Sequence, residues 1–304
     1  MPKIAYLADP RIAELVGPID GLTIVTDADG EPPPDAYDAE VYVPKFLSGG
    51  ASTEIVARLP QLRLLQLATA GAEAWLPVVP DGVTLATARG AHGAATAEWA
   101  VAGLLAVLRE FPGFLDAQRE QRWTSHNTDL LAGKTAIVIG AGDLGERTRR
   151  RLAAFDVDVT MVARTARDGI RSIDELPGLL PEHDVVVLVL PLTEESTGLV
   201  DAAFLAAMPD GAVLVNAARG RVVDTDALVA ELQSGRLRAA LDVTEPEPLP
   251  AGHPLWTVPG LFLTPHVGGS AFGADRRAAA VVRDQLTRYA AGAQVHNVVG
   301  ASGY

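Results

Sequence analysis

The sequence contains no cysteine. Disulfides, thiolate nucleophiles and cysteine-ligated zinc or iron–sulfur centres are therefore excluded. Positive charge is also scarce: 25 lysines and arginines stand against 38 aspartates and glutamates, and the formal net charge is -13. Nucleic acids and anionic membranes need a basic surface, so this balance argues against both partners. It does not exclude a small anionic substrate, because a few local arginines are enough to bind one.

Long apolar runs are missing as well. No stretch approaches the ~18 residues that a membrane span needs. Asp9 and Pro10 follow the N-terminus too closely for a signal peptide. We therefore expect a cytoplasmic protein. The chain nevertheless has 48% hydrophobic residues, and its 304 residues suit two domains better than one small core.

One segment, TAIVIGAGDLG over 135–145, predicts a dinucleotide-binding turn. A short β-branched run leads directly into G-x-G-x-x-G, and the residues after it are typical of a helix. Gly140 would permit the tight turn, Gly142 would let the backbone approach a pyrophosphate, and Gly145 would let the helix pack on the strand. The first N–H groups of the helix would then face the phosphates.

The order of strand-like and helix-like segments predicts an α/β protein with two doubly wound parallel sheets. The smaller domain comprises residues 1–95 and 272–304, and a Rossmann domain over 96–271 is inserted into it. Val295 to Val299 would return to the first domain as a strand. Expected strands of the first domain are 3–8, 22–26, 40–43, 63–68 and 83–88. Expected strands of the second are 135–139, 158–163, 184–190, 212–216, 239–243 and 261–264.

The segment from Ala94 to Arg109 is predicted to be a strongly apolar helix, with Trp99, Ala102 and Leu105 at helical spacing. Such a helix fits equally a packed connector in the core and a surface that pairs with a second copy of the chain. A second helix is expected over 274–291.

The residues after the second strand of the Rossmann domain indicate which cofactor binds. An acid at this strand end would select NAD, whereas a small residue followed by arginine accommodates the 2′-phosphate of NADP. The sequence has Ala163 there, followed by Arg164 and Arg167. Arginine–phosphate hydrogen bonds are charge-assisted and worth roughly 1.5–3 kcal/mol each. We therefore expect NADP(H) to be preferred over NAD(H).

Three further segments each follow a strand of the second domain and would open onto the cofactor crevice. They are LVNAARG over 214–220, ALDVTEPEPLP over 240–250 and LTPHVGGS over 263–270. An arginine, a carboxylate and a histidine beside a nicotinamide are the groups that reduction of a ketoacid requires.

With these motifs, and with PLTEESTGL over 191–199 and GHPLW over 252–256, the chain resembles the D-2-hydroxyacid dehydrogenase family. The resemblance is to its glyoxylate/hydroxypyruvate reductase-like members, and Ala163-Arg164-x-x-Arg167 resembles their NADPH-preferring branch. It implies a flavodoxin-like substrate domain, a small 2-ketoacid or D-2-hydroxyacid as substrate, a homodimer joined around 97–114, and closure of a hinge between the domains.

The resemblance also implies roles for individual residues. Arg219 would pair with the substrate carboxylate and polarise the keto oxygen. His266 would be the general acid in reduction and the base in oxidation, and Glu247 would orient its imidazole and favour the protonated form. The expected cofactor contacts are Gly140, Gly142, Asp143, Leu144, Gly145, Arg164, Arg167, Pro191, Thr197, Ala217, Asp242 and Gly268. Asp242 would lie near the nicotinamide ring.

In the first domain, the resemblance places substrate contacts on Ala70, Gly71 and Ala72, whose backbone N–H groups would face the substrate carboxylate. Trp75 would either line the pocket or fill the core, and Arg89 is either an anion contact or a surface arginine. The other histidines share no spacing or face, so no metal site is predicted.

Three alternatives stay open. A formate dehydrogenase has a related fold, but a glutamine usually partners its histidine, where this chain has Glu247. Phosphite oxidation uses a similar set of residues, but the pocket lysine expected for it is missing from 67–73. The third is an NAD(P)-sensing protein of the corepressor type. A sensor would bind NADPH and oxidise it negligibly with any 2-ketoacid.

Overall fold

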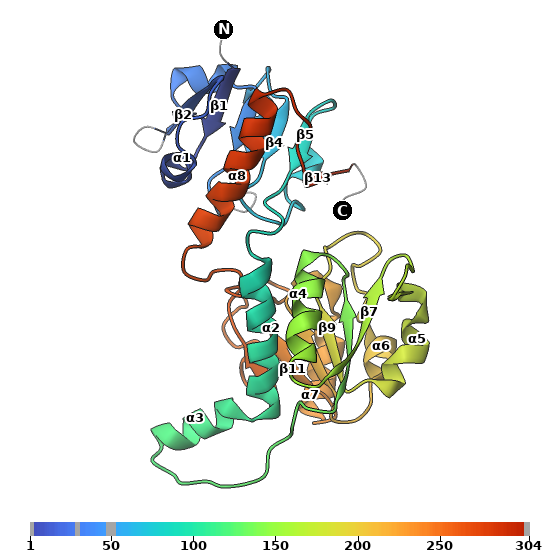
Figure 1. Ribbon diagram of the computed structural model, residues 1–304. Helices are drawn as coiled ribbons and strands as arrows, with labels where there is room; N and C mark the ends of the chain where they lie inside the picture. The colour runs from blue at the N-terminus through green and yellow to red at the C-terminus, as the bar shows by residue number, and fades with distance from the viewer. Residues whose placement is uncertain (1–2, 28–30, 47–52, 301–304) are drawn as a thin grey trace. The chain divides into compact units, whose positions relative to one another are not determined.

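A computed structural model describes residues 3–27, 31–46 and 53–300 of the chain (Figure 1). It divides into two compact units: unit 1 is Met1–His92 with Ala271–Tyr304, and unit 2 is Gly93–Ser270. The first boundary lies after residue 92 instead of the expected 95, because helix α2 already begins at Gly93. The second lies after 270 instead of 271.

Unit 1 is an α/β unit around a six-stranded sheet. Its elements are β1 (Lys3–Leu7), α1 (Pro10–Val16), β2 (Leu22–Thr26), η1 (Pro34–Asp38), β3 (Val41–Val43), η2 (Thr53–Arg58), β4 (Leu64–Gln66), η3 (Leu76–Val78), β5 (Thr84–Ala86), α8 (Ala274–Ala290) and β13 (Val298–Val299). The strand order is β13-β5-β4-β3-β1-β2, parallel except for β13, which pairs antiparallel with β5. Without β13 this is the flavodoxin-like order.

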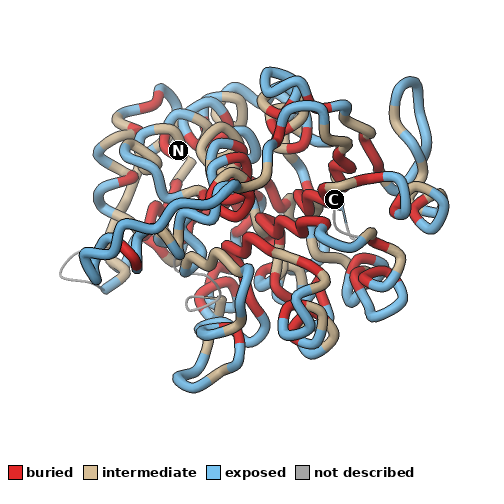
Figure 2. Tube along the Cα trace, turned by 90° about the horizontal axis from the view of Figure 1, so that it is seen from below, coloured by how far each residue is buried: buried red, intermediate tan, exposed pale blue. Residues whose placement is uncertain are grey.

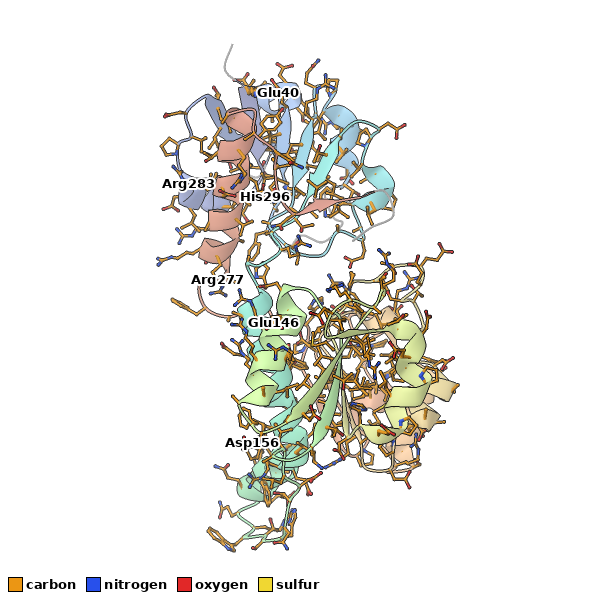
Figure 3. The ribbon with its side chains drawn as sticks, turned by 45° about the vertical axis from the view of Figure 1, so that its right-hand side comes forward. Glu40, Glu146, Asp156, Arg277, Arg283 and His296 are labelled. Atoms are coloured by element: carbon orange, nitrogen blue, oxygen red, sulfur yellow. The ribbon has the colours of Figure 1, made fainter. Side chains whose placement is uncertain are left out.

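Hydrogen bonds fasten the returning helix α8 to the rest of unit 1. Arg283 donates to the carbonyl oxygens of Val16 and Pro18, at the C-terminal end of α1 (Figure 3). Gln285, which is buried, donates from Nε2 to the carbonyl of His296 and accepts its N–H at 2.8 Å. These bonds hold the segment that leads to β13, so the end of the chain completes the domain with which it begins.

Unit 2 carries a seven-stranded, all-parallel sheet in the order β12-β11-β10-β9-β6-β7-β8. Its elements are α2 (Gly93–Leu108), α3 (Phe111–Arg119), β6 (Thr135–Ile139), α4 (Asp143–Ala153), β7 (Asp158–Ala163), β8 (Ile170–Ser172), η4 (Ile173–Glu175), α5 (Leu176–Leu179), η5 (Leu180–Glu182), β9 (Val185–Leu188), α6 (Ala202–Ala207), β10 (Val213–Asn216), η6 (Gly220–Val222), α7 (Thr225–Gln233), β11 (Arg238–Leu241), η7 (Pro254–Trp256) and β12 (Leu261–Leu263).

This order is the doubly wound dinucleotide-binding arrangement with one further strand. The predicted class of two doubly wound α/β domains is confirmed. The strand that the sequence did not predict is β8, whose three residues are too few to give a periodic pattern.

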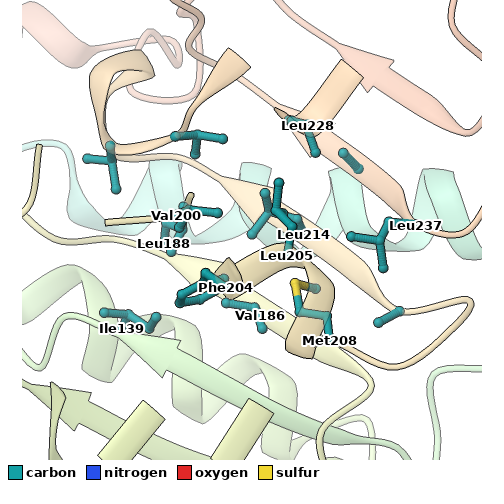
Figure 4. Packing of buried hydrophobic residues seen from close by; sticks show 14 of the residues in the cluster. Ile139, Val186, Leu188, Val200, Phe204, Leu205, Met208, Leu214, Leu228 and Leu237 are labelled. Atoms are coloured by element: carbon teal, nitrogen blue, oxygen red, sulfur yellow. The ribbon is translucent and has the colours of Figure 1, made fainter. Parts of the chain in front are cut away.

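The core of unit 2 lies on both faces of its sheet, as alternation along β6 shows. Ile137 and Ile139 point into the cluster covered by α5, α6 and α7, part of which Figure 4 draws. Ala136 and Val138 point into the opposite cluster, beneath α2 and α4. Figure 2 shows the buried residues in red along the inner segments of the chain. Strands buried on both faces explain the continuous apolar runs in the sequence.

Helix α2 uses its apolar residues inside unit 2. Ala100, Val101, Leu104 and Leu108 are buried in the cluster shared with α4 and the sheet. The expected pairing surface over 97–114 is thus largely covered by the chain's own core. Exposed large apolar side chains of this part of the chain lie after α2, on α3 and the segment that returns from it, and this region extends away from the sheet of unit 2 in Figure 1. Among the described residues, no helix has the length and apolarity needed to cross a membrane.

Candidate active site

The glycine turn between β6 and α4 has the shape that a dinucleotide phosphate needs. Gly140 has φ +116°, and a Cβ on it would lie 2.5 Å from the carbonyl oxygen of Val189. A Cβ on Gly145 would lie 1.8 Å from the carbonyl oxygen of Gly140, so only glycine lets α4 pack this closely on β6. A Cβ on Gly142 would meet nothing within 4 Å. The backbone at Gly142 is therefore open to an approaching group, and the turn fits a pyrophosphate at the helix N-terminus.

Asp143 and Leu144, two of the expected cofactor contacts, use their side chains within unit 2. The Asp143 carboxylate accepts both its bonds from Nε of Arg147, at 2.8 and 2.9 Å. It lies so close to Gly93 that a Cβ there would be 2.2 Å from one carboxylate oxygen. Leu144 packs against the core beneath α2 and α4. For both residues, the backbone N–H is the group that remains for a phosphate.

The arginines after β7 lie near the glycine turn and the PLTEESTGL segment. Nη2 of Arg167 donates to the carbonyl oxygen of Ala141 at 3.1 Å. The pKa of the Glu195 carboxyl is held below its ordinary value, mainly by a hydrogen bond from Thr193 and in small part by the charge of Arg164. The strand itself ends at Ala163, so no acid occupies the position that would face an adenosine ribose.

The segment after β9 forms a compact turn around a buried serine. Oγ of Ser196 donates to the carbonyl of Pro191 at 2.9 Å and accepts the N–H of Thr193 at 2.8 Å. The Thr197 hydroxyl donates to the carbonyl of Thr193 at 2.7 Å. Pro191 and Thr197 are therefore fixed in one turn. Ser196 was not among the predicted residues, although Thr-x-x-Ser after a strand is a signal for such a turn.

Arg219 is placed by a buried asparagine at the end of β10. The Asn216 side chain accepts the N–H of Ala218 and donates to the carbonyl of Arg219, both at 3.0 Å. A Cβ on Gly220 would lie 1.9 Å from the carbonyl oxygen of Thr244, so this turn packs tightly against the one that follows β11. The Arg219 guanidinium donates to the carbonyl of Ala218 at 2.7 Å. Asn216 also escaped sequence prediction; a polar residue ending a buried strand is the only signal for it.

His266 and Glu247, 19 positions apart in the chain, form a close pair. Nδ1 of His266 lies 2.5 Å from Oε1 of Glu247, and the two side chains are 46% and 39% exposed. Because Nδ1 is engaged by the carboxylate, a proton given to a ligand would leave from Nε2. A histidine oriented by a carboxylate is suited to general acid–base catalysis.

Asp242 lies beneath this pair and is almost fully buried, with 3% of its surface exposed. Its carboxylate accepts from the Thr264 hydroxyl at 2.7 Å and from the N–H groups of Val267 and Gly268, each at 2.8 Å. Both carboxylate oxygens therefore bind the turn that carries His266. The partly buried Thr264 is a further polar partner that the sequence did not predict.

The predicted substrate contacts belong to unit 1. Ala70, Gly71 and Ala72 follow β4, where the Thr69 carbonyl accepts the N–H of Ala88 at 2.8 Å. Ala72 is fully buried and packs in the core of unit 1, whereas Ala70 is exposed and Gly71 is partly exposed.

Two residues of unit 1 whose roles the sequence left open have defined places. Trp75 is 4% exposed and packs edge-to-face on Tyr42 with ring centroids 6.2 Å apart, so it fills the core. Arg89 donates to the Asn297 side chain at 3.2 Å, which ties the loop after β5 to the segment before β13. Within residues 3–27, 31–46 and 53–300, no group of three or more histidine, aspartate or glutamate side chains is arranged to hold a metal ion.

Residues 101–268 match the family model described as "D-isomer specific 2-hydroxyacid dehydrogenase, NAD binding domain". This range contains the glycine turn, Arg219, Glu247 and His266. The chain belongs to the D-isomer specific 2-hydroxyacid dehydrogenase family. Membership confirms the resemblance drawn from the motifs, and it identifies unit 2 as the domain that binds a nicotinamide dinucleotide.

Solved structures of the family are similar over nearly the whole chain. A D-isomer specific 2-hydroxyacid dehydrogenase from Xanthobacter autotrophicus, in complex with NADPH and MES, is 32% identical with a TM-score of 0.83, and 99% of each chain is covered. An NADPH-dependent glyoxylate/hydroxypyruvate reductase from Sinorhizobium meliloti, in complex with NADP and sulfate, is 26% identical with a TM-score of 0.85, over 99% of this chain and 100% of that one.

Among curated proteins, the mitochondrial formate dehydrogenase of Hordeum vulgare is 33% identical over 221 residues, which is 68% of this chain. The match spans 58% of the length of that relative.

Proposed function

We propose that the protein reduces a small 2-ketoacid, such as glyoxylate or hydroxypyruvate, to the D-2-hydroxyacid with NADPH. The observation that carries this proposal is the 2.5 Å pair of His266 and Glu247, in a domain that also holds Arg219 and the glycine turn. The similarity to a glyoxylate/hydroxypyruvate reductase that binds NADP supports the choice of substrate and cofactor.

NADPH, when bound, supplies the hydride that is added to C2 of the ketoacid. Arg219 would pair with the substrate carboxylate and polarise the keto oxygen. His266 would donate the proton from Nε2 to that oxygen as C2 becomes tetrahedral. Glu247 would stabilise the imidazolium before the transfer and keep Nδ1 protonated after it. The same groups, acting in reverse, would remove the hydroxyl proton during oxidation.

The remaining predicted residues would hold the two ligands. The N–H groups of the Ala70–Ala72 loop would bind the substrate carboxylate. The glycine turn would bind the pyrophosphate, and Pro191, Thr197, Ala217 and Gly268 would line the rest of the cofactor site. Arg164 and Arg167 would bind the 2′-phosphate, because β7 ends without an acid and Arg167 already reaches the glycine turn. Asp242 would lie close to the nicotinamide ring.

A homodimer is proposed through α3 and the segment that returns from it. Trp123 is 99% exposed, and Phe111 and Leu115 are about half exposed. Aromatic and large aliphatic side chains gathered on one protruding segment favour a protein partner. Light scattering coupled to gel filtration should give twice the 31.8 kDa mass of one chain. The Trp123→Ala variant should shift the mass toward one chain, and an unchanged dimer would contradict this surface.

Oxidation of NADPH and of NADH at 340 nm, with glyoxylate, hydroxypyruvate, pyruvate and bulkier 2-ketoacids, tests the proposed activity. Turnover that favours NADPH on a small ketoacid is expected. Because a formate dehydrogenase is among the relatives of this chain, oxidation of formate with NAD+ and NADP+ should be assayed in parallel. Formate oxidation without ketoacid reduction would contradict the proposal and indicate a formate dehydrogenase. Cofactor binding without any turnover would favour a nucleotide sensor.

A further inference from the structure

We propose that Thr264 is a positioning residue for His266: its hydroxyl fixes the Asp242 carboxylate, which in turn holds the turn that presents the imidazole. This inference rests on the proposed function, since it gives Thr264 a task in acid–base catalysis. In this inference the main role of Asp242 is to hold the turn that carries His266, and its contact with the cofactor is secondary.

The bonds around Asp242 come from a single turn. The Thr264 hydroxyl and the N–H of Val267 both donate to Oδ1, at 2.7 and 2.8 Å, and the N–H of Gly268 donates to Oδ2 at 2.8 Å. The acceptor is a carboxylate with 3% of its surface exposed, so water does not substitute for a missing donor. The hydroxyl therefore sets the rotation of the carboxylate on which the two N–H groups are held.

The backbone of His266 needs this support. Its φ is +53°, in the left-handed region that residues with a Cβ rarely adopt. Its N–H donates to the carbonyl of Asp242 at 2.7 Å. Asp242 thus holds the turn at His266 through its carbonyl oxygen, and on both sides of His266 through its carboxylate. A left-handed non-glycine residue persists where the surroundings determine its conformation, and such residues cluster at functional sites.

The turn has no room to relax toward Asp242. A Cβ on Gly268 would lie 2.7 Å from Oδ2 of Asp242 and 3.3 Å from Cγ of Trp99 on α2. If Oδ1 loses the hydroxyl, the carboxylate must turn or the 266–268 segment must move outward. Either change displaces the imidazole from Glu247. Misplacement of a reacting group by about 1 Å can lower a rate by about a hundredfold.

Thr264→Val removes the donor and keeps the shape of the side chain, and Thr264→Ser restores the hydroxyl. Thr257→Val is the matched control, because the exposed Thr257 makes one long bond of 3.4 Å to the carbonyl of Pro254. We expect Thr264→Val to lower kcat about tenfold to hundredfold. Its Kd for NADPH should stay within about threefold of wild type, and the amides of Val267 and Gly268 should exchange faster with deuterium. Thr264→Ser and Thr257→Val should behave like wild type.

A kcat for Thr264→Val within twofold of wild type would overturn the proposal. So would equal losses in kcat and NADPH affinity, because the contact would then serve cofactor binding. If Thr264→Val does not fold, hydrogen exchange of the wild-type protein is the test. Rapid exchange of the Val267 and Gly268 amides would show that the Asp242 carboxylate does not hold this turn, and would refute the proposal. If wild type reduces no ketoacid, the proposed function fails, while exchange and NADPH affinity still test the role of Thr264.

Discussion

Glu247 Oε1 lies 2.5 Å from His266 Nδ1, and the two residues come from the loops that follow adjacent strands, β11 and β12. Parallel strands bring their carboxyl ends to the same edge of a sheet, and this places a carboxylate beside an imidazole 19 residues away. The pair is about half exposed, so a ligand can reach the imidazole at Nε2.

Replacing His266 with alanine should lower kcat by roughly 10²–10⁴, because the proton donor is lost while hydride transfer still needs one. NADPH affinity, followed by fluorescence titration, should be kept. The control is His126→Ala, which removes an exposed histidine of the same unit that pairs with Glu110. A His266→Ala enzyme within twofold of wild type would refute its role as the acid.

The Glu247→Gln enzyme should lose about tenfold to hundredfold in kcat. The amide can still accept a bond from Nδ1, but it no longer supplies the charge that stabilises the imidazolium, a difference of roughly 1.5–3 kcal/mol. Glu245→Gln, two residues away, is the control and should leave kcat unchanged. Equal losses in kcat in the two variants would mean that the negative charge of the loop as a whole, and not the pair with His266, is responsible.

Cofactor preference should depend on the arginines after β7. Arg164→Ala and Arg167→Ala should each weaken NADPH binding by roughly 1.5–3 kcal/mol, with little effect on NADH. Arg171→Ala is the control, since Arg171 pairs with Glu175 on the protein surface. Calorimetric titration of each variant with both cofactors gives the comparison. Parallel losses for NADH and NADPH would show that the arginines do not read the 2′-phosphate.

The glycine turn offers two alanine substitutions with opposite consequences. Gly145→Ala places a Cβ 1.8 Å from the carbonyl oxygen of Gly140, so α4 must move and the free energy of unfolding should fall by about 1–3 kcal/mol. Gly142→Ala meets nothing within 4 Å, so stability should be kept while NADPH affinity falls, because the methyl group occupies the approach of the phosphate. Urea unfolding and NADPH titration separate the two. Wild-type affinity in Gly142→Ala would contradict the site.

Asp129 should make the stability of unit 2 dependent on acid pH. Burial raises the pKa of this carboxyl, but hydrogen bonds from Arg238, Leu130 and Lys134 outweigh burial and lower it overall. A lowered pKa means that the contribution is present above the unfolded value, about 3.9, and is lost as the pH falls through the folded value.

Asp129→Asn should therefore cost roughly 1 kcal/mol at pH 7, and the difference from wild type should shrink below about pH 4. Urea unfolding of both proteins between pH 7 and pH 3 measures it. The control is Asp210→Asn, whose side chain is 88% exposed. A difference that is constant over this range would show that the charge of Asp129 does not contribute.

The features that the sequence predicted well are those specified by neighbouring residues. The strand, glycine turn and helix over 135–153 need only local periodicity and three glycines, and the strands of both sheets except β8 follow from short apolar runs. The His266–Glu247 pair was inferred from motif resemblance, since nothing local links residues 19 apart. It is the parallel order of β11 and β12 that brings them together.

Other features depend on packing between distant segments. Trp75 fits a pocket or a core equally well by sequence, and its place is decided by its packing on Tyr42 of β3. The apolar face of α2 is covered by α4 and the sheet of unit 2, which its own pattern does not reveal. Asn216 and Ser196 are buried polar residues whose partners are backbone groups of turns, and the partly buried Thr264 bonds the Asp242 carboxylate, which holds a turn. Their roles can be recognised only from the folded structure, in which these hydrogen bonds are formed.

Transfer of deuterium from NADPH that carries deuterium at both C4 positions of the nicotinamide to the product of glyoxylate or hydroxypyruvate reduction tests the central claim most directly. The account predicts one deuterium at C2 of the 2-hydroxyacid, with D configuration when hydroxypyruvate is the substrate, and loss of labelled product in His266→Ala. Unlabelled product, or labelled product of L configuration, would contradict it.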